Sequence, residues 1–85
     1  MYGKFLGYEE YISNHGESWY RLWICTEENE KTGMKIMMLN LSKEAYNNFT
    51  TKGDMRTDDF SLMLGRRVFF TFHKAFLIRM NLCEE

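Results

Sequence analysis

The sequence predicts a small, mainly β barrel built from five strands and one short helix. Three observations lead to this prediction. The chain has 85 residues, which is enough for a single domain, residues 1–85, with one core. Five segments are rich in apolar and aromatic residues with strand-like alternation, and the chain contains no proline to interrupt them. One segment, between the third and fourth strands, has the pattern of a helix.

The first two strands are predicted to form a hairpin. Residues 2–12 have β-forming composition, and Gly3 and Gly7 mark positions where the strand can bend or bulge. Residues 13–16, Ser-Asn-His-Gly, are typical of a turn, and the second strand follows over residues 18–26. We therefore expect these two strands to pair antiparallel.

The third strand leads directly into the helix. A polar loop over residues 27–33 precedes a mostly apolar strand over residues 34–41, which predicts a central position in the sheet. Ser42 is a favourable N-cap residue, so we expect a short helix over residues 43–49. Gly53 is suited to ending this helix.

The last two strands complete the predicted order. Residues 58–64 fit either a helical turn ended by Gly65 or an extended segment, and periodicity does not decide between them. Residues 66–73 and 75–82 read as strands joined by a tight turn at His73–Lys74. The order β-β-β-α-β-β is that of an OB-like barrel, whose closure removes exposed strand edges. The alternative is an open α+β sheet with the helix on one face.

Successive side chains of a strand point to opposite faces. In the second strand, one face carries the apolar residues Tyr20, Leu22 and Ile24. The opposite face carries both tryptophans of the chain around an arginine, followed by a cysteine: Trp19, Arg21, Trp23 and Cys25. The first of these faces is predicted to line the core.

The fourth and fifth strands repeat this division. In the fourth strand, the apolar face is Val68, Phe70 and Phe72, and the mixed face is Arg67, Phe69, Thr71 and His73. In the fifth strand, the alternation predicts an apolar face of Phe76, Ile78, Met80 and Leu82, opposed by Leu77, Arg79 and Asn81. Rings and cations therefore share one face on more than one strand.

A face that mixes rings with cations suits a single strand of DNA or RNA. Aromatic rings stack with bases irrespective of sequence, and Lys or Arg neutralises phosphates. Although the net charge is −1, the stretch 60–83 holds four basic residues and no acidic one. The predicted nucleic-acid-binding residues are Trp19, Arg21, Trp23, Lys35, Arg66, Arg67, Phe69, His73 and Arg79.

The length, the strand order and the rings interleaved with cations resemble the small OB-fold single-stranded-DNA-binding proteins of phages and mobile elements. The resemblance lies in the architecture and includes no diagnostic motif. It implies non-sequence-specific, cooperative binding by a homodimer. Three apolar residues, Met37, Leu39 and Leu77, are expected to need the cover that a second copy would give.

A different class of function is also compatible with the sequence: a small protein-interaction module, or a phage- or plasmid-encoded inhibitor of a host enzyme. Exposed Trp, Tyr, Met and Arg are enriched in protein interfaces. The acid-rich loops could imitate nucleic-acid phosphates toward a basic partner; their acids are Glu27, Glu28, Glu30, Asp54, Asp58 and Asp59. Binding of a strand would instead use the arginines.

Other classes receive little support. The two histidines and the absence of a nucleophile or phosphate-loop motif argue against an enzyme. Cys25 and Cys83 have no partner at metal-ligand spacing, so we expect neither a metal nor a cofactor. No apolar run approaches the ~20 residues of a membrane span, and the N-terminus lacks the apolar stretch of a signal peptide. A cytoplasmic location is the expectation.

Overall fold

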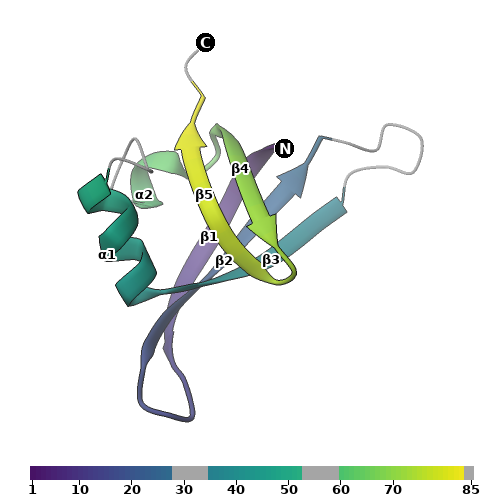
Figure 1. Ribbon diagram of the computed structural model, residues 1–85. Coiled ribbons are helices and arrows are strands. Elements are labelled where there is room, and N and C mark those ends of the chain that lie inside the picture. Colours follow the sequence, from purple (N-terminus) through teal and green to yellow (C-terminus); the bar gives the residue numbers. More distant parts are fainter. Residues whose placement is uncertain (28–34, 53–59, 84–85) are drawn as a thin grey trace.

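The predicted strands close into a barrel, shown in Figure 1. The computed structural model describes residues 1–27, 35–52 and 60–83. The elements in chain order are β1 (Tyr2–Ile12), β2 (Ser18–Thr26), β3 (Lys35–Ser42), α1 (Lys43–Lys52), α2 (Phe60–Met63), β4 (Arg67–His73) and β5 (Phe76–Leu82). Neighbouring strands follow the order β1-β2-β3-β5-β4 around the barrel. The OB-like barrel is confirmed, and the open sheet is not formed.

Strand pairing leaves one hairpin projecting from the barrel. Strands β1 and β2 pair antiparallel along their length, from the pair Gly3 and Thr26 to the pair Ile12 and Ser18. On its other edge, β1 pairs with β4 only at its start. The barrel closes between β3 and β5, which are parallel and joined at Asn40 and Phe76. The far half of the β1–β2 hairpin therefore extends beyond the other strands, as an arm at the lower end of Figure 1.

The turn at the tip of this arm has the geometry that its sequence predicts. The backbone N–H of Gly16 donates to the Ser13 carbonyl at 2.9 Å, and the N–H of Ser13 donates to the Glu17 carbonyl at 2.8 Å. Gly16 has a φ of 79°, a left-handed conformation that favours glycine. The Ser13 hydroxyl also accepts from the backbone N–H of Glu17.

The barrel interior is filled by the apolar faces predicted for β2 and β4. The buried apolar residues are Phe5, Leu22, Ile24, Leu39, Leu41, Phe60, Met63, Val68, Phe70, Leu77 and Met80. Tyr20 and Phe72 are partly buried and pack against this core, as their positions in the alternation predict. The mixed faces of both strands point outward, as predicted.

The helices close the core from one side. The backbone N–H of Ala45 donates to the Ser42 hydroxyl at 3.1 Å, which confirms the predicted N-cap of α1. The helical alternative for residues 58–64 is correct in its described part, because α2 buries Phe60 and Met63. The predicted helix end at Gly53 lies outside the described residues. Neither described helix is long and apolar enough to cross a membrane.

The apolar face predicted for β5 is wrong in its first half. Leu77 is buried, while Phe76 and Ile78 are 47% and 49% exposed. The cause is a β-bulge: Thr71 pairs with Arg79, but Phe72 pairs with Leu77, so Ile78 is an additional residue in β5. An additional residue inverts the alternation on one side of the bulge.

The apolar residues predicted to need cover by a second copy are not the exposed apolar residues of the barrel. Leu39 and Leu77 are buried in the core, and Met37 packs against it. The exposed apolar residues of β3 are instead Ile36 and Met38, at 60% and 49% exposure. The homodimer stays a prediction, and the positions of Met37, Leu39 and Leu77 do not support it.

Gly3 allows β1 and β2 to approach closely, and we expect Gly3→Ala to destabilise the fold by about 1–3 kcal/mol through overpacking. A Cβ atom at this position would lie 2.7 Å from the Cys25 carbonyl oxygen and 2.7 Å from Cγ2 of the buried Ile24. Gly7→Ala is the matched control, because a Cβ atom there meets no heavy atom within 4 Å. Urea unfolding of both variants measures the difference. Equal stability of the two variants would contradict this packing.

Candidate nucleic-acid interface

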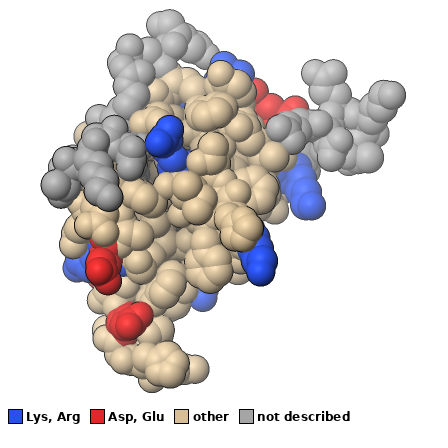
Figure 2. Space-filling view, viewed as in Figure 1, with Lys and Arg blue, Asp and Glu red and all other residues tan. Residues whose placement is uncertain are grey.

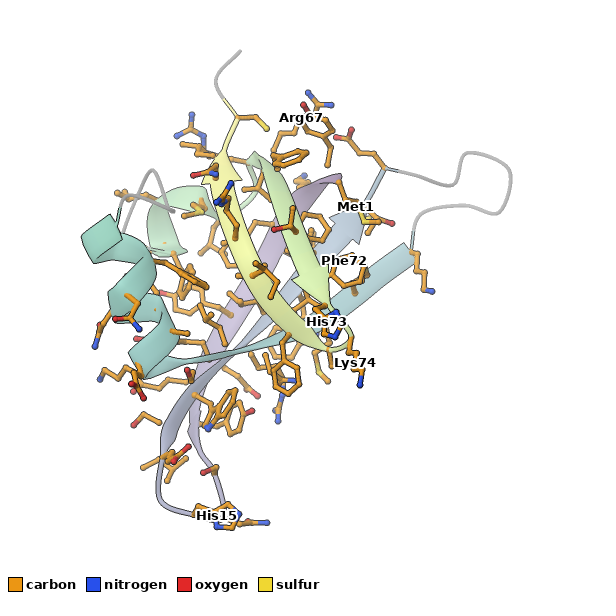
Figure 3. All side chains as sticks on the ribbon, in the orientation of Figure 1. Met1, His15, Arg67, Phe72, His73 and Lys74 are labelled. Atoms are coloured by element: carbon orange, nitrogen blue, oxygen red, sulfur yellow. The ribbon has the colours of Figure 1, made fainter. Side chains whose placement is uncertain are left out.

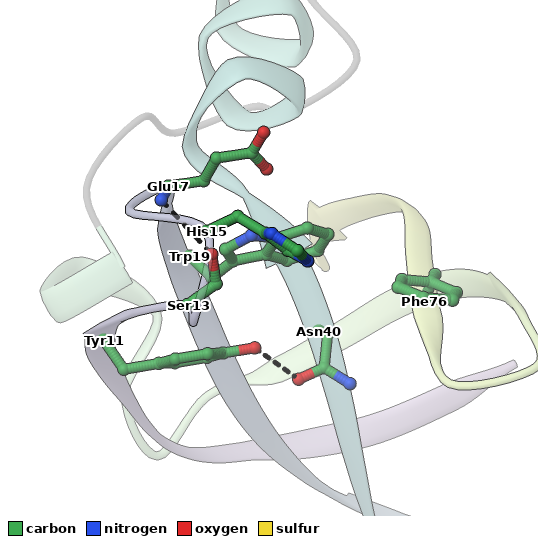
Figure 4. A pocket seen from close by; sticks show the side chains of 7 residues that line it. All are labelled: Tyr11, Ser13, His15, Glu17, Trp19, Asn40 and Phe76. Atoms are coloured by element: carbon green, nitrogen blue, oxygen red, sulfur yellow. Dashed lines mark hydrogen bonds between the residues drawn. The ribbon is translucent and has the colours of Figure 1, made fainter.

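A groove lies between the tip of the β1–β2 arm and the turn that joins β4 to β5 (Figure 4). Its volume is about 310 Å³, at the lower end of the ~300–1,000 Å³ typical of ligand sites. Three separate parts of the barrel contribute its lining residues: Tyr11, Ser13, His15, Glu17, Trp19, Asn40 and Phe76. The groove therefore exists only when the barrel has closed.

Three aromatic side chains lie around this groove. Trp19 is half-buried, and its ring centroid lies 6.1 Å from that of Phe76, with a 49° angle between the planes. Tyr11 is directly opposite Trp19 in the β1–β2 register. Phe76 faces outward here because of the β5 bulge, so the same irregularity that the alternation missed completes the aromatic lining.

Asn40 connects the walls of the groove. Its side-chain Oδ1 accepts from the Tyr11 hydroxyl at 3.1 Å, and its Nδ2 donates to the Ala75 carbonyl at 3.2 Å. The backbone N–H of Asn40 also donates to that carbonyl, at 2.8 Å. Ala75 follows Lys74, whose φ of 56° places the turn in a left-handed conformation. One amide thus fixes a strand of the arm and the β4–β5 turn relative to each other.

Arg21 and Trp23, predicted to bind nucleic acid with Trp19, do not line the groove. The Arg21 guanidinium lies 4.4 Å from the centroid of the Tyr11 ring and forms an ion pair with Glu9. The Arg21 Nε is buried without a hydrogen-bond partner in the described structure. Trp23 lies further along β2, opposite Gly7 on one side and Met38 on the other. Arg21 therefore contacts Tyr11, which lines the groove, without lining it itself.

Arg67 lies at the opposite end of β4 from the groove, as Figure 3 shows. Its Nε and one terminal nitrogen donate to the two carboxylate oxygens of Glu27 at 2.9 and 3.0 Å, and its guanidinium lies 4.3 Å from the Tyr2 ring centroid. The hydrogen bonds from Arg67 lower the pKa of Glu27, and the same bonds raise the pKa of Arg67. Phe69 contacts Tyr2 edge-on at 5.0 Å.

The remaining predicted residues are exposed and dispersed. Lys35 begins β3, and Arg66 precedes β4 in the turn after α2. Arg79 lies on β5 beside the bulge. His73 ends β4 at the turn that borders the groove. Of the residues predicted from sequence, Trp19 lines the groove and His73 adjoins it.

Six of the lining residues are not among those predicted from the sequence: Tyr11, Ser13, His15, Glu17, Asn40 and Phe76. A signal for them was available. In OB folds, oligonucleotides and oligosaccharides bind on the second and third strands between the first turn and the β4–β5 turn. The predicted strand order therefore indicates these turns and their neighbours, residues 11–17 and 73–76, together with the third strand, which carries Asn40.

Comparisons with protein families, curated proteins and solved structures found no match to this chain. Across the described residues, no three His, Cys, Asp or Glu side chains gather into a group that could hold a metal ion. The groove presents three rings, an imidazole, an amide, a hydroxyl and a carboxylate.

Proposed function

We propose that the protein binds single-stranded nucleic acid, with bases held in the groove between the β1–β2 turn and the β4–β5 turn. The observation that supports this most directly is the position of three rings around that groove: Tyr11, Trp19 and Phe76. OB folds bind oligonucleotides at this position of the barrel. Binding is independent of sequence, because every base offers a π-face to an aromatic ring.

Stacking supplies most of the affinity in this proposal. Base–aromatic stacking contributes ~1–3 kcal/mol per base. The rings are also partly held in place before binding, because Tyr11 hydrogen-bonds to Asn40 and Trp19 contacts Phe76. A preordered ring loses less conformational freedom when a base stacks on it.

Phosphate contacts contribute less. Arg21 and Arg67 each form an ion pair with a carboxylate, and Glu17 places a further carboxylate at the groove. On the face shown in Figure 2, basic side chains appear as separate patches and not as a continuous stripe. Lys74, in the turn that borders the groove, is the cation nearest in sequence to Phe76.

We expect oligo(dT) to bind with weak salt dependence. Each phosphate contact to a single strand contributes about −0.7 to the slope of log K against log salt, so two contacts give about −1.4. Fluorescence anisotropy of labelled oligo(dT) at several salt concentrations measures this slope. Ile36→Ser is a control with unchanged affinity, because Ile36 does not line the groove. A slope of about −4 would indicate a charged surface instead, and absence of binding at low salt would contradict the proposal.

We further propose that the protein is a cytoplasmic single-stranded-DNA-binding protein of a phage or mobile element and that it acts as a homodimer. A protein-interaction module is the second candidate, favoured by the exposed apolar side chains of Ile36, Met38 and Ile78. These side chains are the kind that protein interfaces bury. Failure of oligonucleotide binding in the titration above would favour this second candidate.

A further inference from the structure

A second pocket lies where α2 leads into β4, at the end of β4 opposite to the groove. Its volume is about 360 Å³, and it is lined by Gly65, Arg66, Arg67 and Cys83. We propose that this pocket binds a phosphate group. The proposal does not depend on the function proposed for the groove, because β4 has seven residues and therefore separates the two sites by roughly 20 Å.

Arg67 is held in a fixed orientation at this pocket. Two of its nitrogens donate to Glu27, and its guanidinium plane lies against the Tyr2 ring. A guanidinium has five N–H donors, so this arrangement leaves donors available for an oxyanion. A side chain oriented by a carboxylate and a ring also loses little freedom when a ligand binds.

Further positive charge surrounds Arg67. Arg66 precedes it in the chain and lines the same pocket, and Lys4 is its cross-strand partner on β1. Neither Arg66 nor Lys4 forms an ion pair with any carboxylate of the described residues, whereas Glu27 is paired with Arg67. Among the residues that the structure describes, three cations and one carboxylate therefore lie at this end of the barrel, which favours an anionic ligand.

The chemistry of the donors indicates a phosphate group. Guanidinium groups bind phosphate oxygens through parallel N–H bonds, which gives both charge and geometric fit. The exposed lysine, Lys4, adds a further positive charge beside the two arginines, which suits a group that carries more than one negative charge. Two sources share this chemistry: inorganic phosphate and the terminal phosphate of a nucleotide.

Titration with inorganic phosphate, followed by ¹H–¹⁵N spectra at constant ionic strength, tests the proposal. We expect saturable shifts of the backbone amides of Arg66, Arg67 and Cys83 while the amide of Trp19 stays in place. Chloride at the same ionic strength should leave these amides unshifted. Non-saturable shifts, or equal shifts with chloride, would overturn the proposal.

Substitutions separate geometry from charge. Arg66→Ala and Arg67→Lys should each weaken phosphate binding about tenfold, the second because it keeps the charge but removes the paired N–H donors. Lys74→Ala, at the opposite end of β4, is the charge-matched control with unchanged affinity. Dispersed spectra of each variant show that it is folded. Full retention of affinity in folded Arg66→Ala would contradict the assigned pocket.

Comparison of thymidine 5′-monophosphate with thymidine identifies the source of the phosphate. Tighter binding of the nucleotide than of inorganic phosphate, with shifts at Arg66 and Arg67, identifies a terminal nucleotide phosphate. Equal affinities identify the free ion. The proposal is rejected if neither inorganic phosphate nor thymidine 5′-monophosphate shifts the amides of the arginines. Shifts at the groove with thymidine would, in that case, leave the groove assignment unaffected.

Discussion

Phe70→Ala destabilises the protein by about 3–5 kcal/mol, the largest effect that we expect from any single substitution. The Phe70 ring is completely buried and lies 6.0 Å from the Phe72 ring. Its backbone also joins the start of the chain to β4, because Phe70 N–H donates to the Met1 carbonyl and the Met1 ammonium donates to the Phe70 carbonyl. Removal of the ring leaves a cavity beside the seam where β1 pairs with β4.

This loss is large relative to the total stability because the domain is small. A chain of 85 residues has a total stability of roughly 4–13 kcal/mol, so this single change removes a large share of it. Urea unfolding followed by circular dichroism measures the loss. Phe76→Ala is the matched control, because the same residue type is 47% exposed there and its removal should cost about 0.5 kcal/mol or less. Comparable losses in the two variants would contradict the outward position of Phe76.

Trp19→Ala weakens the binding of oligo(dT) by about 1–3 kcal/mol, which corresponds to roughly 5- to 150-fold in the dissociation constant. Trp19 lines the groove and contacts Phe76, so its loss removes one stacking surface and frees a second ring. Anisotropy titrations at low salt measure the change. The variant remains suitable for binding studies because Trp19 is not among the buried core residues.

Trp23→Ala provides the control for this substitution. Trp23 lies on the same face of β2 and is also half-buried, but it does not line the groove. Its removal should leave the affinity for oligo(dT) within about twofold of the original protein, provided that thermal unfolding shows a folded variant. Equal loss of affinity in both variants would extend the interface along the whole outer face of β2. Loss in Trp23→Ala alone would contradict the groove.

The architecture could be predicted because it depends on local patterns. Alternation within β2 and β4 identified the inward residues, and a serine identified the start of α1. The pattern failed in β5, where Ile78 is an extra residue whose effect appears only when the pairing with β4 is known. Periodicity assumes an uninterrupted strand, so it cannot detect a bulge within a run of apolar residues.

The candidate site was only partly predictable because it depends on contacts between distant segments. Arg67 and Glu27 are 40 residues apart, and no local feature indicates that the predicted phosphate-binding arginine is already paired. Asn40 is 29 residues from Tyr11 and 35 from Ala75. The pattern on β2 predicts Trp19 together with Arg21, but the groove at Trp19 is formed with side chains from β1, the β1–β2 turn, β3 and β5.

The most direct test of the proposed function uses the two tryptophans as separate reporters. Trp23→Phe leaves Trp19 at the groove as the only indole, and Trp19→Phe leaves Trp23 outside it. The proposed function predicts that oligo(dT) at low salt quenches the fluorescence of the protein that retains Trp19 and leaves the protein that retains Trp23 nearly unchanged. Quenching of Trp23 without quenching of Trp19, or of neither, would contradict the assignment of the groove as the binding site.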